Sequence, residues 1–210
     1  MKTPLATFFI ILFCLAMANG QPNNEKVSEP PVWTETDRQY LLDNLIRSKE
    51  DLINETKDLT EAQWNFKESP EAWSINQIVE HLGLYELIFD NNIAVALQMG
   101  PFPKHSYYAP DSVFMDQDPQ DKKKNKTTDF TKPFSYSVPM GNNKGSDNLT
   151  WVTKMRQEAI DFVKSEDRNL RIYYVNFGPN VHQKCIQIFS HSDRHLRQIK
   201  RVKANVNFPK

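Results

Sequence analysis

Four long segments of this chain carry apolar residues at intervals of three and four, and this periodicity is the strongest constraint on its fold. Such spacing places apolar side chains on one face of an α-helix, ready to be buried against other helices. The segments extend over Leu41–Leu59, Ile75–Leu97, Leu149–Val163 and Ile188–Val202. Because no alternating strand pattern separates them, we predict an all-α fold, a four-helix bundle with a long loop between the second and third helices.

Capping signals indicate where these helices begin and end. Side chains that can accept a hydrogen bond from the first turn precede each periodic segment, and three of them form capping boxes. The caps are predicted at Thr36, Ser74, Asp147 and Asn180. Gly100 and Pro101 predict the end of the second helix, because Gly favours the left-handed cap conformation and Pro cannot donate the next hydrogen bond. The segment 173–175 indicates either a short strand or extended chain.

The predicted second and third helices are joined by residues 100–146, which contain six of the thirteen prolines. Connections of this length are uncommon in compact domains and often form lids or binding loops. His105 lies on this connection with Tyr107 and Tyr108. We predict that His105 is exposed, and the alternative is that this part of the connection forms a lid over a site. The three lysines at 122–124 indicate a solvated loop. Because 26 basic residues balance 26 acidic ones, we expect no nucleic-acid partner.

The N-terminus has the pattern of a secretory signal peptide over residues 1–20. Lys2 precedes an apolar run, and the tripeptide Ala16-Met17-Ala18 fits a cleavage site. The run is shorter than the roughly 20 residues of an uncleaved membrane helix. We therefore expect an exported protein, periplasmic or secreted, with no stable membrane anchor after cleavage. Residues 21–33 are polar and predict a linker.

Cleavage would remove Cys14 and leave Cys185 as the single cysteine, which excludes an internal disulfide and predicts a buried, inert thiol. Three N-x-T sequons matter only if the host glycosylates exported proteins, which the sequence does not decide. They lie at Asn54, Asn125 and Asn148.

The histidines supply the strongest chemical signal. His191 and His195 are four residues apart on the predicted fourth helix, so their side chains leave it within about 40° of each other. Two imidazoles at this spacing can bind one metal ion. His81 lies near the apolar face of the second helix, so three histidines converging from two helices predict a metal site. Three protein ligands leave a coordination position open for water or substrate.

Four stretches of the chain resemble the DinB-like domain family. They are Leu59-Thr60-Glu61-Ala62-Gln63-Trp64, Ser69-Pro70-Glu71-Ala72-Trp73-Ser74-Ile75, Glu80-His81-Leu82 and His191-Ser192-Asp193-Arg194-His195-Leu196-Arg197-Gln198-Ile199. The resemblance implies a DinB-like four-helix bundle domain over residues 34–208. It also implies that His81, His191 and His195 hold one divalent metal ion, with Zn, Ni, Fe and Mn all open.

The resemblance also frames the expected function, because the family includes metal-dependent hydrolases, thiol-dependent S-transferases and a maleylpyruvate isomerase. We expect an exported, hydrolase-like enzyme whose metal activates water or polarises a small-molecule substrate. Two alternatives stay open: a non-catalytic metal- or ligand-binding bundle, and a thiol-dependent S-transferase-like enzyme. Gln77 stands where the family often has Glu, and an amide cannot act as a base, so no catalytic residue is assigned. The family also allows a homodimer.

Several polar residues near these histidines are weaker candidates. The side chain of Glu80 leaves the helix about 100° away from that of His81. We therefore predict that Glu80 is a surface carboxylate, with a general base as the alternative. His182, near a helix start, predicts a surface residue. Asp193 and Arg194 lie between the two fourth-helix histidines and are predicted to face solvent or to pair with neighbouring residues. Arg197 and Gln198 follow His195 and are suited to orient an imidazole or a substrate anion.

Overall fold

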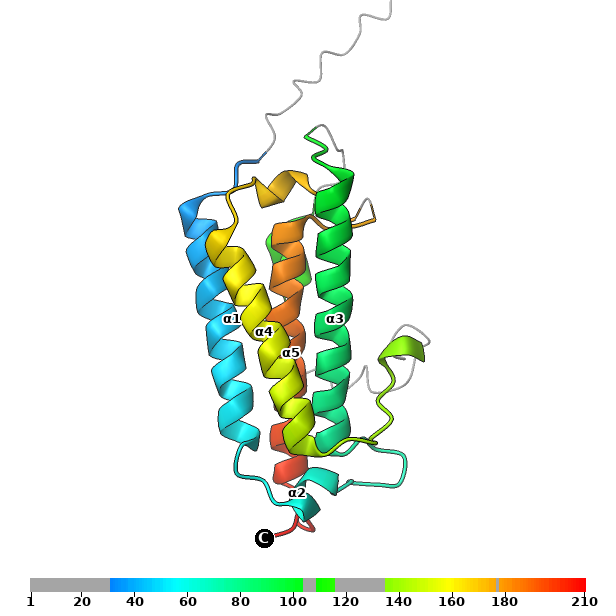
Figure 1. Ribbon diagram of the computed structural model, residues 1–210. Helices are drawn as coiled ribbons and strands as arrows, with labels where there is room; N and C mark the ends of the chain where they lie inside the picture. Colours follow the sequence, from blue (N-terminus) through cyan, green and yellow to red (C-terminus); the bar gives the residue numbers. More distant parts are fainter. Residues whose placement is uncertain (1–30, 104–108, 116–134, 177) are drawn as a thin grey trace, which may run out of the picture.

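The computed structural model describes residues 31–103, 109–115, 135–176 and 178–210. Its four long helices are α1 (Glu35–Thr56), α3 (Ile75–Met99), α4 (Gly145–Ser165) and α5 (Val181–Lys203). The connections contain the short helix α2 (Glu61–Asn65) and the 3-10 turns η1 (Asp111–Phe114), η3 (Ser135–Ser137) and η4 (Leu170–Ile172). Within these described ranges the only β pairing is an isolated bridge between Tyr174 and Asn180. The predicted all-α four-helix bundle is confirmed (Figure 1).

The helices are not arranged as a simple up-down-up-down bundle. Helix α1 packs against α4 and α5, and α3 packs against the same two helices, so the consecutive pairs α1/α3 and α4/α5 lie diagonally. In Figure 1, α1 and α5 run downwards, whereas α3 and α4 run upwards. Neighbours α3 and α4 are therefore parallel, which is possible because the long connection of residues 100–144 returns the chain to the end where α3 began.

Two of the four predicted helix caps are confirmed, and the cap predicted for the first helix is wrong. Ser74 caps α3 with Gln77, and Asn180 caps α5 with Gln183, each in a complete capping box. Helix α1 is capped by Thr34 and not by Thr36. The reason is that Asp37, three residues after Thr34, completes the box: its backbone N–H donates to Thr34 Oγ1 at 3.1 Å and its carboxylate accepts from Thr34 N at 2.9 Å.

The prediction that Asp147 caps the third helix is also wrong. Helix α4 begins three residues earlier than this cap predicts, at Gly145, with Lys144 at the cap position. Gly145 packs directly on the ring of Trp64, where an added Cβ would overlap the indole. Asp147 lies in the first turn instead, where a carboxylate interacts favourably with the exposed N–H groups of a helix N-terminus.

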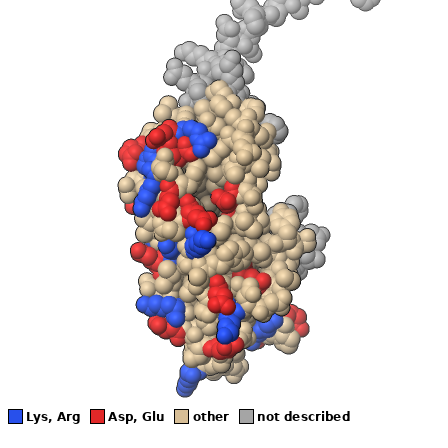
Figure 2. Space-filling model, viewed as in Figure 1, with Lys and Arg blue, Asp and Glu red and all other residues tan. Residues whose placement is uncertain are grey.

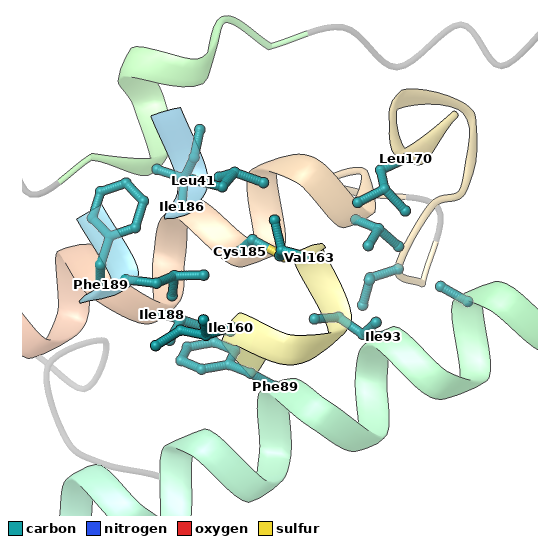
Figure 3. Close-up of a cluster of buried hydrophobic side chains, with 14 residues drawn as sticks. Leu41, Phe89, Ile93, Ile160, Val163, Leu170, Cys185, Ile186, Ile188 and Phe189 are labelled. Carbon is teal, nitrogen blue, oxygen red and sulfur yellow. The ribbon is translucent and has the colours of Figure 1, made fainter. Parts of the chain in front are cut away.

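Two clusters of buried apolar side chains fill the interior at successive levels along the bundle. Figure 3 shows the first, in which Leu41, Ile160 and Ile186 meet from three helices. Cys185 belongs to it, and burial together with the nearby Glu86 carboxylate raises the pKa of its thiol to about 12. The prediction that this thiol is buried is confirmed, and the raised pKa favours its neutral, less reactive form. Figure 2 shows charged side chains of both signs over α1 and α4, while the α3 side of that view carries few.

A buried ion pair between α3 and α4 connects all four long helices. Arg156 on α4 donates from Nε to the Glu86 carboxylate on α3 at 3.0 Å and also bonds it through Nη2. The same guanidinium donates to Ser48 Oγ on α1 and to the main-chain oxygen of Ile188 on α5 at 3.4 Å. Burial raises the pKa of Glu86, and the opposing charge of Arg156 offsets part of that rise. This pair was not predicted from the sequence.

Several predictions fall on residues that the structure does not describe. They are the signal peptide of residues 1–20, His105 with its two tyrosines, the lysines at 122–124, and Asn125. Trp33, at the end of the predicted linker, packs against the first core cluster and donates its backbone N–H to Asn169 Oδ1 at 2.9 Å. Of the described helices, none has both the length and the hydropathy to cross a membrane.

Candidate metal centre

The structure brings His81 on α3 together with His191 and His195 on α5. One nitrogen from each imidazole lies within 4.8 Å of the other two, which is close enough for a single ion to contact all three. The Nε2 atoms of His191 and His195 are 3.1 Å apart, as the four-residue spacing on one helix predicts. His81 reaches the pair from the neighbouring helix, with its ring centroid 4.8 Å from that of His195.

Hydrogen bonds fix which nitrogen two of these imidazoles present. His81 Nδ1 lies 2.7 Å from the main-chain oxygen of Ser137, and His195 Nδ1 lies 2.9 Å from Gln198 Oε1. Both partners are acceptors, so each Nδ1 carries the proton and each Nε2 keeps its lone pair. His195 Nε2 faces His191 Nε2 at 3.1 Å, where His191 donates a hydrogen bond if its proton is on Nε2 and offers a second metal ligand if its proton is on Nδ1. The donor set therefore fits a metal ion, and Gln198 orients an imidazole as expected.

The surroundings keep the imidazoles neutral. Burial lowers the pKa of His81, and burial together with the neighbouring His81 and Arg194 lowers the pKa of His195 to about 3. The pKa of His191 lies well below its ordinary value because of burial and the two adjacent histidines. Neutral imidazole is the form that binds metal. The site therefore does not have to lose protons to accept an ion near neutral pH.

Aromatic rings surround the three histidines. Trp73 lies 4.8 Å from the His81 ring, and Tyr85 stacks on His191 with centroids 4.2 Å apart. The His81 and His195 side chains are buried, whereas His191 and Tyr85 are only partly covered. Among the described residues, His191 and Tyr85 therefore mark the side of the cluster that is least covered. Tyr85 was not singled out in the sequence, although its position four residues after His81 places it on the same helix face.

A segment of the long connection, residues 135–143, runs along the first turns of α3 and is called the strap below. Its Ser137 accepts the hydrogen bond from His81. The backbone N–H groups of Met140 and Gly141 donate to the two carboxylate oxygens of Glu80, at 3.1 and 2.7 Å. Gly141 adopts φ +72°, a conformation that glycine tolerates and other residues rarely adopt.

The prediction for Glu80 is wrong. Because the strap covers it, Glu80 is neither a surface carboxylate nor a free base. Its side chain is 7% exposed, and both oxygens are occupied by the strap backbone. Glu80 would be exposed on an isolated helix, and the segment that covers it comes from about sixty residues further along the chain. Asn76 adds another bond to the strap by donating to the oxygen of Asn143 at 2.8 Å. The sequon residue Asn148 is also buried here, with its amide donating to Asn76 Oδ1.

The prediction of a surface position for His182 is wrong. Its side chain is 1% exposed, accepts from Trp33 Nε1 at 3.1 Å and contacts Asp111 Oδ2 at 3.2 Å. Because η1 and the segment before α1 cover the start of α5, a position that is exposed in an isolated helix is buried in the fold. His182 is not part of the three-histidine cluster.

Asp193 and Arg194 lie as predicted, one paired with a neighbour and the other facing solvent, whereas the orienting role expected of Arg197 stays a prediction. Asp193 pairs with Arg47 of α1, with carboxylate and guanidinium atoms 2.8 and 2.9 Å apart. Arg194 and Arg197 are on the exposed face of α5. Asn54 is exposed on α1. Ser137, whose main-chain oxygen orients His81, was missed, because a backbone acceptor leaves no mark in the amino-acid sequence.

Fold and site together define a class of protein: four-helix bundles in which two helices direct three histidines to one point. A family model of the DinB superfamily matches residues 44–199, and the chain belongs to that superfamily. Among solved structures it is similar to YfiT from Bacillus subtilis, described as a probable metal-dependent hydrolase with an unusual four-helix bundle topology. The TM-score is 0.54 at 11% identity, with 84% of this chain and 91% of that chain covered. A comparison with curated proteins gave no match.

Proposed function

We propose that this protein is a divalent-metal-dependent enzyme of the hydrolase type, with one ion held by His81, His191 and His195. The observation that carries the proposal is the convergence of three imidazoles, two of them with Nδ1 held by an acceptor. A bound divalent ion supplies Lewis-acid chemistry, which polarises a substrate oxygen or lowers the pKa of a bound water towards about 7. Membership of the DinB superfamily and the fold shared with YfiT support the hydrolase class.

The donor set favours a catalytic role for the ion over a purely structural one. Three nitrogen ligands suit Zn, Ni or Fe(II). Among the described residues, no Asp, Glu or Cys joins the three histidines as a fourth ligand. Structural zinc sites are closed by four protein ligands, whereas catalytic sites keep one position for substrate or water. The partly covered His191 and Tyr85 give a substrate a route to that position.

The residues around the three histidines orient the ligands, and none of them is assigned the transfer of a proton. The strap and Gln198 keep two imidazoles in the tautomer that presents Nε2. Glu80 does not serve as the general base, because both of its oxygens accept from the strap backbone. The proposed reaction therefore depends on the ion and on groups that the substrate brings, and Glu80 contributes through the strap and not as a base.

The test is metal content and hydrolysis in protein purified without a histidine tag. We expect about one divalent ion per chain, and a tenfold or larger loss of metal affinity in each of His81→Gln, His191→Gln and His195→Gln. The matched control is His182→Gln, which alters a buried histidine outside the cluster and should retain the ion. Chelator-sensitive cleavage of chromogenic esters, amides or phosphate esters, lost in His191→Gln, would support the enzyme. Equal metal content in all four variants would contradict the site.

A further inference from the structure

Helix α3 has an apolar outer face that the other described elements leave uncovered. The helix packs against α4 and α5 on its inner side, and its first turns also contact α2 and the strap. On the outer side, Leu87, Val95 and Met99 are 42%, 52% and 47% exposed. Figure 2 shows the same feature as a side of the molecule with few charged residues. A continuous apolar stripe of this kind usually marks an interface with another protein surface.

The outer face has the residue spacing of helices that pair with each other. Intervals of three, one and three residues repeat over two heptads and place seven side chains on one face, called the α3 seam below: Leu84, Leu87, Ile88, Asn91, Ala94, Val95 and Gln98. Five of them are apolar, two are amides, and none is charged. Burial and Glu158 of α4 raise the pKa of Asp90, which therefore lies towards α4 and outside the seam. Apolar heptads interrupted by a single amide are typical of paired helices.

The chemistry of the chain favours a second copy as the occupant of the seam. Residues 116–134, which lie outside the described ranges, contain nine charged side chains and two phenylalanines, a composition suited to water. A second α3 instead brings a charge-free apolar face, and a two-fold axis matches the seam with itself. The exposed half of a helix of 25 residues has an area of about 600 Å². With the strap beside it, this approaches the roughly 800 Å² that each partner buries in a stable interface.

The strap determines the orientation of such a pair. Glu80, which the strap covers, is four residues before Leu84, so the strap occupies the same face of α3 one turn before the seam. Two parallel seams would bring both straps to the same level, where they compete for the same space. Antiparallel seams centred on Asn91 place the straps at opposite ends, each beside the last turn of the partner's α3. The contact is apolar on the strap as well, because Val138 and Met140 are 45% and 74% exposed.

We propose that this protein forms a two-fold homodimer in which the α3 seams of two copies pack antiparallel, with Asn91 at the axis. Each strap then packs against the end of the partner's α3. Because Ser137 of the strap accepts the hydrogen bond from His81, the interface extends to the segment that orients a candidate metal ligand. The dimer itself does not depend on whether a metal is bound.

Disulfide formation between copies tests the geometry, in the full chain carrying Cys14→Ser so that the buried Cys185 is the only native thiol left. Asn91→Cys should give a covalent dimer under mild oxidation, and so should a mixture of Leu84→Cys with Gln98→Cys. Leu84→Cys alone should not, because antiparallel pairing separates its two copies by about 21 Å along the axis. The matched control is Asn54→Cys, an exposed asparagine of α1. Equal cross-linking of Asn91→Cys and Asn54→Cys, or ready cross-linking of Leu84→Cys alone, would overturn the proposed arrangement.

Sedimentation velocity tests the dimer without introduced cysteines. The wild-type chain should sediment at twice its mass of 24.5 kDa. Val95→Glu places a charge in the seam and should raise the dimer dissociation constant by about tenfold or more, with unchanged circular dichroism because the side chain is exposed. Ile46→Glu on α1 is the matched control, since Ile46 is an exposed aliphatic residue outside the seam. A monomeric wild-type chain, as expected if another part of the chain covers the seam, or a dimer unaffected by Val95→Glu would overturn the proposal.

Discussion

The Nδ1 atom of His81 donates to the main-chain oxygen of Ser137 at 2.7 Å, across 56 residues of sequence. A carbonyl oxygen can only accept, so this bond fixes the tautomer of His81 and directs Nε2 towards the other two histidines. The orientation of a candidate metal ligand on α3 therefore depends on the long connection between α3 and α4. Partners of this kind fix the tautomer and the ring orientation of a metal-binding imidazole.

Glu80→Gln should weaken metal binding although Glu80 contacts no metal ligand atom. The substitution replaces one accepting oxygen with an amide that cannot accept from the strap backbone, which loosens the segment that orients His81. We expect metal affinity to fall by about 10- to 100-fold, the usual effect of losing an outer-shell partner. Competition with a chromophoric chelator measures it. Glu71→Gln, an exposed carboxylate, is the control, and equal affinities in both variants would contradict the role of the strap.

In the presence of chelator, the free energy of unfolding should fall as the pH falls below about 6.5. Burial lowers the pKa of His195 to about 3 in the folded protein, whereas an unfolded histidine titrates near 6.5. Below that value the unfolded chain binds a proton that the folded imidazole does not, so acid favours unfolding. Each such histidine adds a slope of about 1.4 kcal/mol per pH unit.

Urea denaturation at several pH values between 7.5 and 4.5 measures this slope. His195→Gln should reduce it by about 1.4 kcal/mol per pH unit, because that variant removes one group whose pKa differs between the two states. The pKa values of His81 and His191 are lowered too, so part of the slope should remain in the variant. Identical slopes in the two proteins would contradict the lowered pKa of His195.

Arg156→Met should destabilise the bundle by about 3–5 kcal/mol, the range observed when one member of a buried ion pair is removed. The variant leaves the Glu86 carboxylate buried without its charge partner. The double variant Glu86→Leu with Arg156→Met should lose much less than the sum of the single variants, since no isolated charge remains. Denaturant melts of the three variants test this, and additive losses would show that the pair acts independently.

The N-terminal residue of the protein in its native host tests the predicted signal peptide. Intact-mass spectrometry should show that about the first twenty residues are missing, because the apolar run ends in small residues suited to cleavage. Cell fractionation should place the mature chain outside the cytoplasm. Recovery of a mature protein that retains Met1 or Lys2 would contradict export by cleavage.

The sequence by itself determined the helices and the identity of the three clustered histidines. Apolar spacing is a property of each segment alone, and so are the capping boxes at Ser74 and Asn180, which join residues three positions apart. The pair His191 and His195 likewise follows from the turn of a single helix. Interactions of this short range are encoded in neighbouring residues and therefore appear directly in the sequence.

Only the tertiary structure decided which helices are neighbours, and with them the environment of each polar residue. Glu80 is buried because the strap crosses it, and His182 is buried because η1 and Trp33 cover the start of α5. Arg156 meets Glu86 because α3 and α4 lie side by side. Each case depends on segments about sixty or more residues apart in sequence. Their encounter follows from burying four apolar faces at once, a property of the whole chain and of no single segment.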